Sequence, residues 1–479
     1  MSIVARAEDY SRWYLDVIRE ADLAENSPVR GSMVIKPYGF ELWENVKAGL
    51  DRRFKETGHQ NAYFPLFIPM SFLQKEADHV KGFAPELAVV TIGGGEQLDE
   101  PLVVRPTSET IFGYMYSRWV QSYRDLPLLI NQWANVVRWE MRTRPFLRTM
   151  EFLWQEGHTA HATAQEAIEE TLRMLDVYAD FAINDAAIPV IKGVKSDREK
   201  FAGAVNSYTI EAMMGNGWAL QSGTSHYLGD NFARAFDIKF LDQNNEMQYC
   251  HTTSWGVSTR MVGAVIMAHG DDQGLRLPPV LAPIQVVVVP IWRKDHERGQ
   301  VLAHCDAVLA QLKEAGVRVK LDAREDQTPG FKFNDWEMRG VPVRVEVGPR
   351  DVQSNAVVLA RRDQPGRDGK QFGVPLEGLA VRVRALLKEI QDNLLAQATA
   401  SREEQTTRVA SYDEFKEVLD SKGGFIRVHW AGSDADEARI QEETRATLRC
   451  LPLDVPEGEG VCFLTGKVTD RVAIFARAY

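Results

Sequence analysis

Two apolar stretches between residues 131 and 161 contain charged and polar side chains, and this combination limits the possible folds more than any other feature of the chain. Burying a charged group costs free energy unless a partner compensates for the lost water. Because successive side chains of a strand point to opposite faces, the spacing predicts Arg138 and Glu140 on one face and Val137 and Trp139 packed on the other. An ion pair that ties a hairpin together and a site for a charged ligand both explain this pattern.

The second stretch repeats the pattern. The same alternation places Trp154, Glu156 and His158 on one face of a second predicted strand. The turn between the two strands is basic and contains Arg142, Arg144 and Arg148. Arginine offers planar, paired donors and stays charged, so this turn suits a polyanion such as a triphosphate.

Composition excludes several classes of protein. The longest nearly apolar run, residues 280–292, is interrupted by Pro283, Gln285 and Pro290 and is too short to span a bilayer. The N-terminal residues lack the basic start and apolar core of a secretory signal, so we expect a cytoplasmic protein with no membrane partner. The 4 cysteines, at positions 250, 305, 450 and 462, are too widely spaced for a disulfide framework and form no CxxC pair.

The net charge of −11 argues against nucleic-acid binding over the whole surface, because neutralising phosphates requires Lys and Arg. A local stretch between residues 339 and 370 nevertheless has more bases than acids. Its bases are Arg339, Arg344, Arg350, Arg361, Arg362, Arg367 and Lys370. A solvated sheet face and an RNA-binding surface both fit this stretch.

Residues 1–276 have the pattern of an α+β domain with a mostly antiparallel sheet. Residues 36–56 have helical spacing and end before Gly58. The apolar run 61–69 contains two prolines, which predicts an edge strand or a break, and glycines at 93–95 predict a hairpin turn.

A proline-rich segment at 277–283 marks a boundary, after which the pattern changes. Residues 283–375 alternate between strand and helix patterns, as in a small α/β unit. We assign residues 376–479 to a linker helix around 379–396 and a small α+β C-terminal domain.

Several segments, in the same order, resemble the motifs of class II aminoacyl-tRNA synthetases, specifically of the prolyl-tRNA synthetase family of the archaeal and eukaryote-like type. Residues 58–69 are similar to motif 1, and residues 256–260 are similar to motif 3. Arg138-Trp-Glu140 is similar to the Arg-x-Glu of motif 2, and Thr107-Ser-Glu109 to a Thr-x-Glu loop that holds the imino group of the amino acid. The resemblance extends over essentially the whole chain and implies a class II catalytic domain at 1–276, an anticodon-binding domain at 283–375 and a C-terminal domain at 376–479.

The resemblance implies ATP-dependent ligation of L-proline to tRNA(Pro) through a prolyl-adenylate, with Mg²⁺ accompanying ATP. It implies a homodimer with Pro65 at the interface, and it makes Arg138 and Arg260 the catalytic clamps on the phosphates. The implied proline-binding residues are Thr107, Glu109, Arg138, Trp154, Phe201 and His226. The implied ATP-binding residues are Arg138, Glu140, Arg148, Thr149, Gln221, Thr224, Ser258 and Arg260. The stretch 331–350 is the candidate for reading anticodon bases.

The chain departs from this family in two places. Archaeal-like relatives have a zinc site of four cysteines, and the matching positions here are Ala431, Asp436, Cys462 and Thr465. We therefore expect no structural zinc, although Cys450 and His429 lie nearby in sequence. Arg138 and Arg260 are 122 positions apart (260 − 138), which leaves no room for the editing insertion of bacterial-type relatives.

Two alternatives remain open at this stage. One is a class II synthetase for another amino acid, such as threonine, glycine or histidine; threonine recognition uses a Cys/His zinc site, and Cys250 alone lies near the predicted pocket strands. The other is a paralogue that has lost catalysis, although Arg138, Glu140 and Arg260 are all present.

Overall fold

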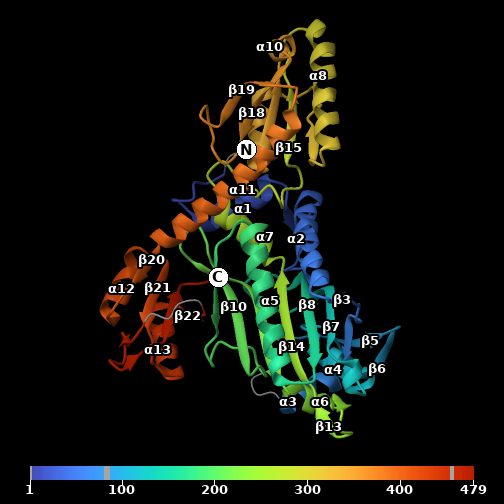
Figure 1. The fold of residues 1–479 in the computed structure, drawn as a ribbon, viewed down its shortest axis with the longest axis vertical. Coiled ribbons are helices and arrows are strands. Elements are labelled where there is room, and N and C mark those ends of the chain that lie inside the picture. Colours follow the sequence, from blue (N-terminus) through green and yellow to red (C-terminus); the bar gives the residue numbers. More distant parts are fainter. Residues whose placement is uncertain (1–2, 80–86, 454–457) are drawn as a thin grey trace.

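The computed structural model describes residues 3–79, 87–453 and 458–479, and its largest feature is an 11-stranded sheet through the middle of the molecule (Figure 1). Neighbouring strands are antiparallel except for the pairs β20–β21 and β3–β7. In spatial order the strands are β20 (Thr406–Arg408), β21 (Phe425–His429), β25 (Val472–Ala476), β22 (Thr447–Pro452), β9 (Val190–Val194), β10 (Asn206–Met213), β11 (Ala219–Gly229), β14 (His251–Ser258), β8 (Glu151–His161), β7 (Leu128–Val137) and β3 (Gln60–Asn61). The predicted antiparallel sheet of an α+β fold is confirmed.

The prediction for the first polar stretch is wrong beyond Val137. Strand β7 ends there, opposite Glu151, the first residue of β8, so strand alternation no longer applies to the next residues. Trp139 is 48% exposed and does not pack on the face opposite Arg138. The prediction for the second stretch is confirmed, because Trp154, Glu156 and His158 all face one cavity.

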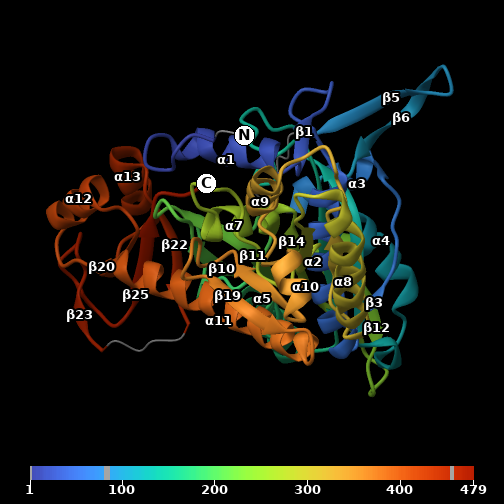
Figure 2. The same cartoon turned by 90° about the horizontal axis from the view of Figure 1, so that it is seen from above.

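The run 61–69 is broken at Pro65, as predicted, and Pro69 is the last residue of the strand that follows. Strand β3 lies at the edge of the large sheet, and β4 (Phe67–Pro69) belongs to a separate sheet with β5 (Ala88–Gly93) and β6 (Glu96–Val104). Strands β5 and β6 form the predicted hairpin, which projects from the body of the molecule in Figure 2. Both turn glycines, Gly94 and Gly95, have positive φ angles of 63° and 88°, which side chains other than glycine rarely adopt.

Helix α5 (Ala164–Asn184) covers one face of the large sheet, packing on β10, β11 and β14 (Figure 1). Helices α2 (Pro37–Glu56) and α7 (Arg260–His269) contact each other, and their apolar side chains join those of α5 in the largest hydrophobic core. This leaves the opposite face of β8, β11 and β14 for other contacts. The remaining elements before residue 277 are α1 (Tyr10–Glu20), α3 (Met70–His79), α4 (Glu109–Trp119), α6 (Asn231–Phe236), a 3₁₀ turn at Tyr123–Asp125, and strands β1 (Ala24–Asn26), β2 (Met33–Ile35), β12 (Lys239–Leu241) and β13 (Met247–Tyr249).

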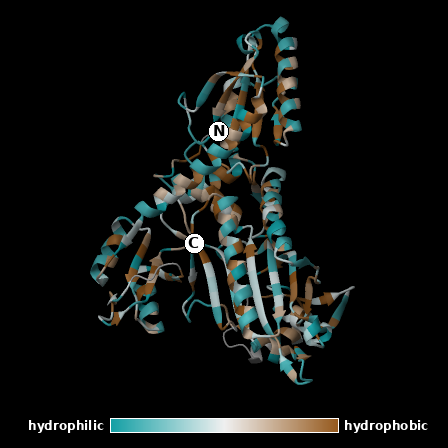
Figure 3. Cartoon of the chain, viewed as in Figure 1, coloured by the Kyte–Doolittle hydropathy of each residue, from teal (hydrophilic) through white to brown (hydrophobic). Residues whose placement is uncertain are grey.

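Residues 285–375, here called the α/β unit, form a five-stranded sheet in the order β16-β15-β17-β18-β19. Val286 and Val288 of β15 pack in the core that includes α8 and α11, whereas Val287 and Val289 pack with Trp336 of α9, so this strand is buried on both faces. Figure 3 shows hydrophobic colour concentrated in this unit, whereas the strands of the large sheet are pale over much of their length. The elements are β15 (Val286–Pro290), α8 (Asp295–Glu314), β16 (Val319–Leu321), α9 (Pro329–Met338), β17 (Val343–Val347), α10 (Pro349–Gln353), β18 (Ala356–Arg361) and β19 (Lys370–Pro375).

Helix α11 (Leu379–Glu404) extends beyond the predicted end near Ala396. Residues 396–404 contain alanines and charged helix formers and no glycine or proline, so the helix has no local stop signal. The helix leads to residues 406–479, here called the C-terminal unit, which contains α12 (Tyr412–Ser421), α13 (Asp434–Thr444) and the short strands β23 (Gly460–Val461) and β24 (Val468–Thr469) besides four strands of the large sheet.

The C-terminal unit continues the large sheet, because β22 pairs with β9 through Leu451 opposite Val194 and Pro452 opposite Gly193. Ala219 also forms a bridge with Ala478. This unit therefore docks on the rest of the chain.

The positions that match the relatives' zinc ligands lie partly together. Cys462 is buried, and hydrogen bonds from Thr465 and from the backbone of Ala431 hold the pKa of its thiol below the usual value even though burial raises it. No group of three His, Cys, Asp or Glu side chains suited to a metal occurs in residues 3–79, 87–453 and 458–479. The absence of structural zinc stays a prediction.

No helix in the described part of the chain is long and apolar enough to cross a membrane.

Candidate active site

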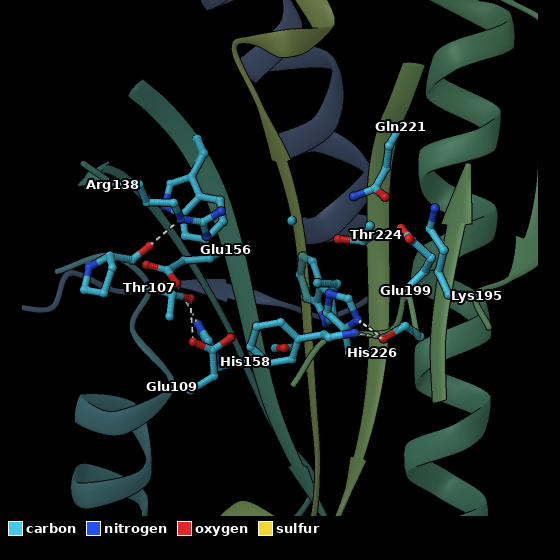
Figure 4. Close-up of a pocket in the computed structure, with 17 residues that line it drawn as sticks. Thr107, Glu109, Arg138, Glu156, His158, Lys195, Glu199, Gln221, Thr224 and His226 are labelled. Carbon is cyan, nitrogen blue, oxygen red and sulfur yellow. Dashed lines mark hydrogen bonds and ion pairs between the residues drawn. The ribbon is translucent and has the colours of Figure 1, made fainter. Parts of the chain in front are cut away.

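A cavity of about 480 Å³ opens on the face of the large sheet that α5 leaves free (Figure 4). Its walls come from β8, β11, β14, the residues before α4, and the segment between β9 and β10. It is lined by Pro106, Thr107, Glu109, Arg138, Trp154, Glu156, His158, Lys195, Glu199, Phe201, Ser207, Gln221, Thr224, His226, Ser254, Trp255 and Gly256. All six residues predicted to bind the amino acid are in this set.

A buried carboxylate lies at one end of the cavity. Glu109 is the first residue of α4 and is 7% exposed, so its carboxylate lies at the N-terminus of a helix, where the partial charge is positive. The Thr107 hydroxyl donates to Glu109 Oε2 at 2.5 Å and fixes the orientation of the carboxylate. This pair can accept hydrogen bonds from a cationic amine.

Arg138 lies opposite this carboxylate. The Arg138 side chain is open to the cavity but is closely surrounded by protein atoms, and this desolvation lowers the pKa of its guanidinium. The charges of Glu109 and Glu156 partly oppose the decrease. Arg138 Nε donates to the Pro106 carbonyl at 3.0 Å, and the guanidinium carbon lies 5.3 Å from the centre of the Trp154 ring. The backbone contact and the aromatic ring hold a cation in place while leaving its other N–H groups available to an anion.

The Glu156 carboxylate beneath Arg138 is fully occupied by internal partners. It accepts hydrogen bonds from Ser108 N–H at 3.1 Å, from the Ser108 hydroxyl at 2.5 Å and from Gln132 at 2.9 Å, and it lies 3.0 Å from His158 Nε2. Burial raises the pKa of Glu156, but its hydrogen-bond partners, His158 first, lower it by more. The pKa of Glu156 therefore lies below its usual value. Glu156 therefore positions neighbouring groups and supplies a fixed negative charge.

The opposite wall of the cavity is aromatic. The Phe201 ring stacks on His226, with centroids 4.9 Å apart. Ser207 links the two residues, because its Oγ accepts from Phe201 N–H at 2.9 Å and lies 2.8 Å from His226 Nδ1. Burial, with a contribution from the charge of Lys195, lowers the pKa of His226 to about 3, so its ring is neutral at physiological pH. A neutral, flat wall of this kind suits a small apolar ring.

Arg260, the other predicted clamp, begins α7 just outside the cavity lining. Its Nε donates to the Leu147 carbonyl at 3.0 Å and its guanidinium donates to the Gln221 carbonyl at 3.3 Å, which places it behind the residues that line the cavity. Burial, together with the charges of Arg148 and Arg138, lowers the pKa of Arg260 to about 10, so it remains a cation at neutral pH. The structure thus brings Arg260 within electrostatic range of Arg138 and Arg148, which lie in the connection between β7 and β8.

The other predicted ATP-binding residues divide into two groups. Gln221 and Thr224 of β11 line the cavity. Residues Glu140, Arg148, Thr149 and Ser258 do not belong to its lining. Arg148 Nε lies 3.7 Å from Glu140 Oε2, the Thr149 hydroxyl donates to the Glu151 carbonyl, and Ser258 Oγ accepts from Arg260 N–H.

Sequence reasoning missed several residues of the cavity. Glu156 and His158 were placed on the correct face of their strand but were not assigned to the site, although alternation with Trp154 gave the signal. Lys195, Glu199 and Ser207 were not identified. They lie in and beside the segment between β9 and β10, whose sequence has no recognisable motif.

The basic stretch of the α/β unit is largely neutralised in the structure. Five of its seven bases form ion pairs: Arg339 with Asp335, Arg344 with Glu346 and Glu337, Arg361 with Asp363, Arg362 with Asp271, and Lys370 with Glu346. Arg350 and Arg367 are the exposed members of the set.

Comparisons with known families match three consecutive regions of the chain. The family described as "tRNA synthetase class II core domain (G, H, P, S and T)" matches residues 91–269. The family described as "Anticodon binding domain" matches residues 285–386, and "Prolyl-tRNA synthetase, C-terminal" matches residues 412–479.

Similar proteins cover the whole chain. Proteins named proline–tRNA ligase from Roseiflexus sp. (strain RS-1) and Chloroflexus aurantiacus are each 62% identical over 479 residues, spanning 100% of this chain and 99% of the relative. The chloroplastic and mitochondrial proline–tRNA ligase of Arabidopsis thaliana is 57% identical over 100% of this chain and 88% of its own length.

Solved structures of prolyl-tRNA synthetase from Cryptosporidium parvum have the same fold. The complex with halofuginone and AMPPNP superimposes with a TM-score of 0.94 at 40% identity and covers 99% of both chains. The complex with L-proline and AMP gives a TM-score of 0.92 at 38% identity and also covers 99% of both chains.

Proposed function

This chain belongs to the prolyl-tRNA synthetase family, and on that premise we propose that it joins L-proline to tRNA(Pro) using ATP. The observation that carries the proposal is one cavity in which a buried carboxylate, Glu109, lies opposite a guanidinium, Arg138, with aromatic rings in the wall beside them. An amino acid zwitterion with an apolar ring has the complementary arrangement of charges and surface.

In the proposed amino acid subsite, Glu109 and Thr107 accept the two N–H groups of the secondary ammonium of proline. Arg138 pairs with the proline carboxylate, and Trp154, Phe201 and His226 enclose the pyrrolidine ring. The neutral state of His226 supports this assignment, since a charged imidazolium would repel the substrate ammonium.

In the proposed nucleotide subsite, Arg138 and Arg260 contact the phosphates of ATP. Gln221 and Thr224, which already line the cavity, contact the adenosine portion, and Glu140, Arg148, Thr149 and Ser258 complete the site from the neighbouring loop and strand end. Mg²⁺ enters with ATP as part of the substrate, since phosphate oxygens are the ligands that this ion prefers. The Cryptosporidium parvum complexes, which contain L-proline with AMP and halofuginone with AMPPNP, support a cavity that holds both kinds of ligand.

The reaction proceeds in two steps. A carboxylate oxygen of proline attacks the α-phosphorus of ATP, the bond to the bridging oxygen breaks, and pyrophosphate leaves. A terminal ribose hydroxyl of tRNA then attacks the prolyl-adenylate carbonyl, and AMP leaves with the bonding electrons. Neither step requires a protein nucleophile. Catalysis comes from positioning by the cavity and from stabilisation of phosphate charge by Arg138 and Arg260.

The tRNA and a second subunit complete the proposal. The anticodon stem would bind the α/β unit, where residues 331–350 remain the candidate for base contacts and Arg350 is exposed. A homodimer would form through residues 58–69, where Pro65 and Tyr63 are exposed, Tyr63 to 73%. A cytoplasmic location, where tRNA is charged, belongs to the same proposal.

Exchange of labelled pyrophosphate into ATP, measured with each amino acid in turn, tests the proposal. We expect exchange with proline in the absence of tRNA, and formation of prolyl-tRNA when tRNA(Pro) is added. Exchange that depends on threonine, glycine or histidine instead would favour another class II specificity. No exchange with any amino acid would favour a non-catalytic paralogue.

A further inference from the structure

A buried cluster of three charged residues connects the C-terminal unit to the wall of the cavity. Glu211 of β10 has a fully buried side chain, and it pairs with two cations. Lys195 Nζ donates to Glu211 Oε1 at 3.0 Å, and Arg449 Nε donates to Glu211 Oε2 at 3.0 Å. Lys195 belongs to the cavity lining, whereas Arg449 belongs to β22 of the C-terminal unit.

The geometry of the cluster is tightly determined. Lys195 Nζ also donates to the Arg449 carbonyl at 2.8 Å, so Arg449 holds Lys195 through its backbone and through Glu211. Thr209 donates to Glu211 Oε1, and Arg449 donates to Thr447. Burial raises the pKa of Glu211, but the charges of Arg449 and Lys195 lower it by more, so the carboxylate is ionised. Both cations are needed to compensate for its buried charge.

The C-terminal unit also holds the residues that follow Lys195. The Ser196 hydroxyl donates to Glu437 of α13 at 2.9 Å, and Arg198 donates to Gln441 of α13 at 2.5 Å. The same segment contains Glu199 and Phe201, which line the cavity. Figure 4 shows Lys195 and Glu199 on the side of the cavity opposite Thr107, Glu109 and Arg138.

One wall of the cavity therefore has the C-terminal unit behind it. Phe201 stacks on His226, and both are proposed to contact the proline ring. Arg138, Arg148 and Arg260, proposed for the phosphates of ATP, lie outside the segment 195–203. We propose that Arg449 is a positioning residue, which holds Lys195 and the segment 195–203 so that Phe201 and His226 form the amino acid subsite. The C-terminal unit thereby sets the affinity for proline without touching the substrate. This inference rests on the proposed function.

The test uses the full-length protein with Arg449→Met, Arg449→Lys and the matched control Arg439→Met, which removes an exposed pair with Glu443 within α13 of the same unit. Pyrophosphate exchange is measured over ranges of proline and of ATP. We expect Arg449→Met to raise the KM for proline at least about tenfold, because a small displacement of a positioned group is enough to weaken binding strongly. The KM for ATP should change by no more than about threefold, since the charges of Arg449 and Glu211 also act on Arg260 but do not position it. Arg449→Lys should restore part of the loss, and Arg439→Met should match the wild type.

A second measurement does not depend on proline. Arg198 and Lys200 are cleavage sites for trypsin in the segment 195–203, and Arg449→Met should accelerate cleavage there relative to the wild type and to Arg439→Met. If the wild type shows no proline-dependent exchange, the proposed function fails, while the cleavage rates still test the positioning of the segment.

Should Arg449→Met not fold, Gln441→Ala leaves the buried cluster intact and removes the bond to Arg198. It should raise the KM for proline by a smaller factor and speed cleavage. An unchanged KM for proline with unchanged cleavage in the folded variants would overturn the proposal, as would equal rises in the KM for proline and for ATP.

Discussion

At the scale of single residues, burial determines which charged side chains hold the cavity together and which can bind a ligand. Glu156 makes four contacts with Ser108, Gln132 and His158 and holds the site together, whereas Arg138 keeps free N–H groups towards the cavity. The motif resemblance identified Arg138, Glu109 and His226 because they occur in recognisable local patterns. Lys195 and Glu199 could not be found in this way, because Lys195 and Ser196 of their segment are held by residues more than 200 positions away.

Loss of either clamp should reduce activation strongly. Arg138→Ala and Arg260→Ala each remove a preorganised donor from the phosphates, so we expect a fall in kcat for pyrophosphate exchange of about 10²- to 10³-fold, or about 3 to 4 kcal/mol. Arg52→Ala, which removes an exposed pair with Glu56 on α2, serves as the control and should retain wild-type exchange. Circular dichroism should show an unchanged fold, and near-normal exchange in either clamp variant would end the assignment.

At the scale of elements, local signals predicted most helices and strands but not all of their ends. The helix at residues 37–56, the hairpin at 93–95 and the break near Pro65 follow from helical spacing, glycines and prolines. The end of β7 was not predictable, because it depends on where β8 begins to pair with it. The length of α11 was underestimated, since a polar sequence without a stop signal looks like a loop unless its packing is known.

Gly157 tests how closely β8 and its neighbours pack under the cavity. A Cβ at this position would overlap the Trp255 ring, which lines the cavity. We expect Gly157→Ala to cost about 1 to 3 kcal/mol of stability and to reduce proline-dependent exchange. Gly299→Ala, in open space on helix α8, is the control and should leave the thermal unfolding midpoint equal or slightly higher. A stable and fully active Gly157→Ala would contradict the described packing.

The C-terminal unit should fold without zinc. Its apolar core includes Phe415, Trp430 and Phe475, and its sheet is continuous with the larger one, so packing replaces the metal. We predict that the purified protein contains no stoichiometric zinc and that a chelator leaves its thermal unfolding unchanged. One tightly held zinc per chain, with loss of this unit on chelation, would refute the prediction.

At the scale of the whole molecule, the sequence predicted three successive units but not the continuous sheet that joins the first to the last. The β9–β22 pairing has no local signature, because strands of this length pair with any suitable edge and the choice depends on the rest of the fold. The predicted domain boundaries stay predictions.

The short separation in sequence between Arg138 and Arg260 has a consequence for the accuracy of amino acid selection. Residues 139–259 form the strands and helices of the catalytic core and contain no additional domain. Each missing methylene changes binding by only about 1 to 3 kcal/mol, so alanine should be activated with a kcat/KM about 10²- to 10⁴-fold below that of proline. Alanine-dependent exchange measures this, with leucine as a larger control that should give none. Without an editing insertion, we expect mischarged alanyl-tRNA to be hydrolysed by a separate protein. Rapid hydrolysis of alanyl-tRNA by the enzyme alone would argue against this expectation.

The continuous sheet also determines the order in which the molecule can be assembled. Strands β9 and β22 are separated in the chain by part of the catalytic core, the α/β unit and α11, so their pairing must close a very long loop and has a large entropic cost. The five strands of the α/β unit pair with partners that are closer in sequence, so its sheet can form first. Arg449 belongs to β22 and contacts Lys195 at the cavity wall only when β22 pairs with β9. Refolding protein should therefore regain its helices before it regains proline activation.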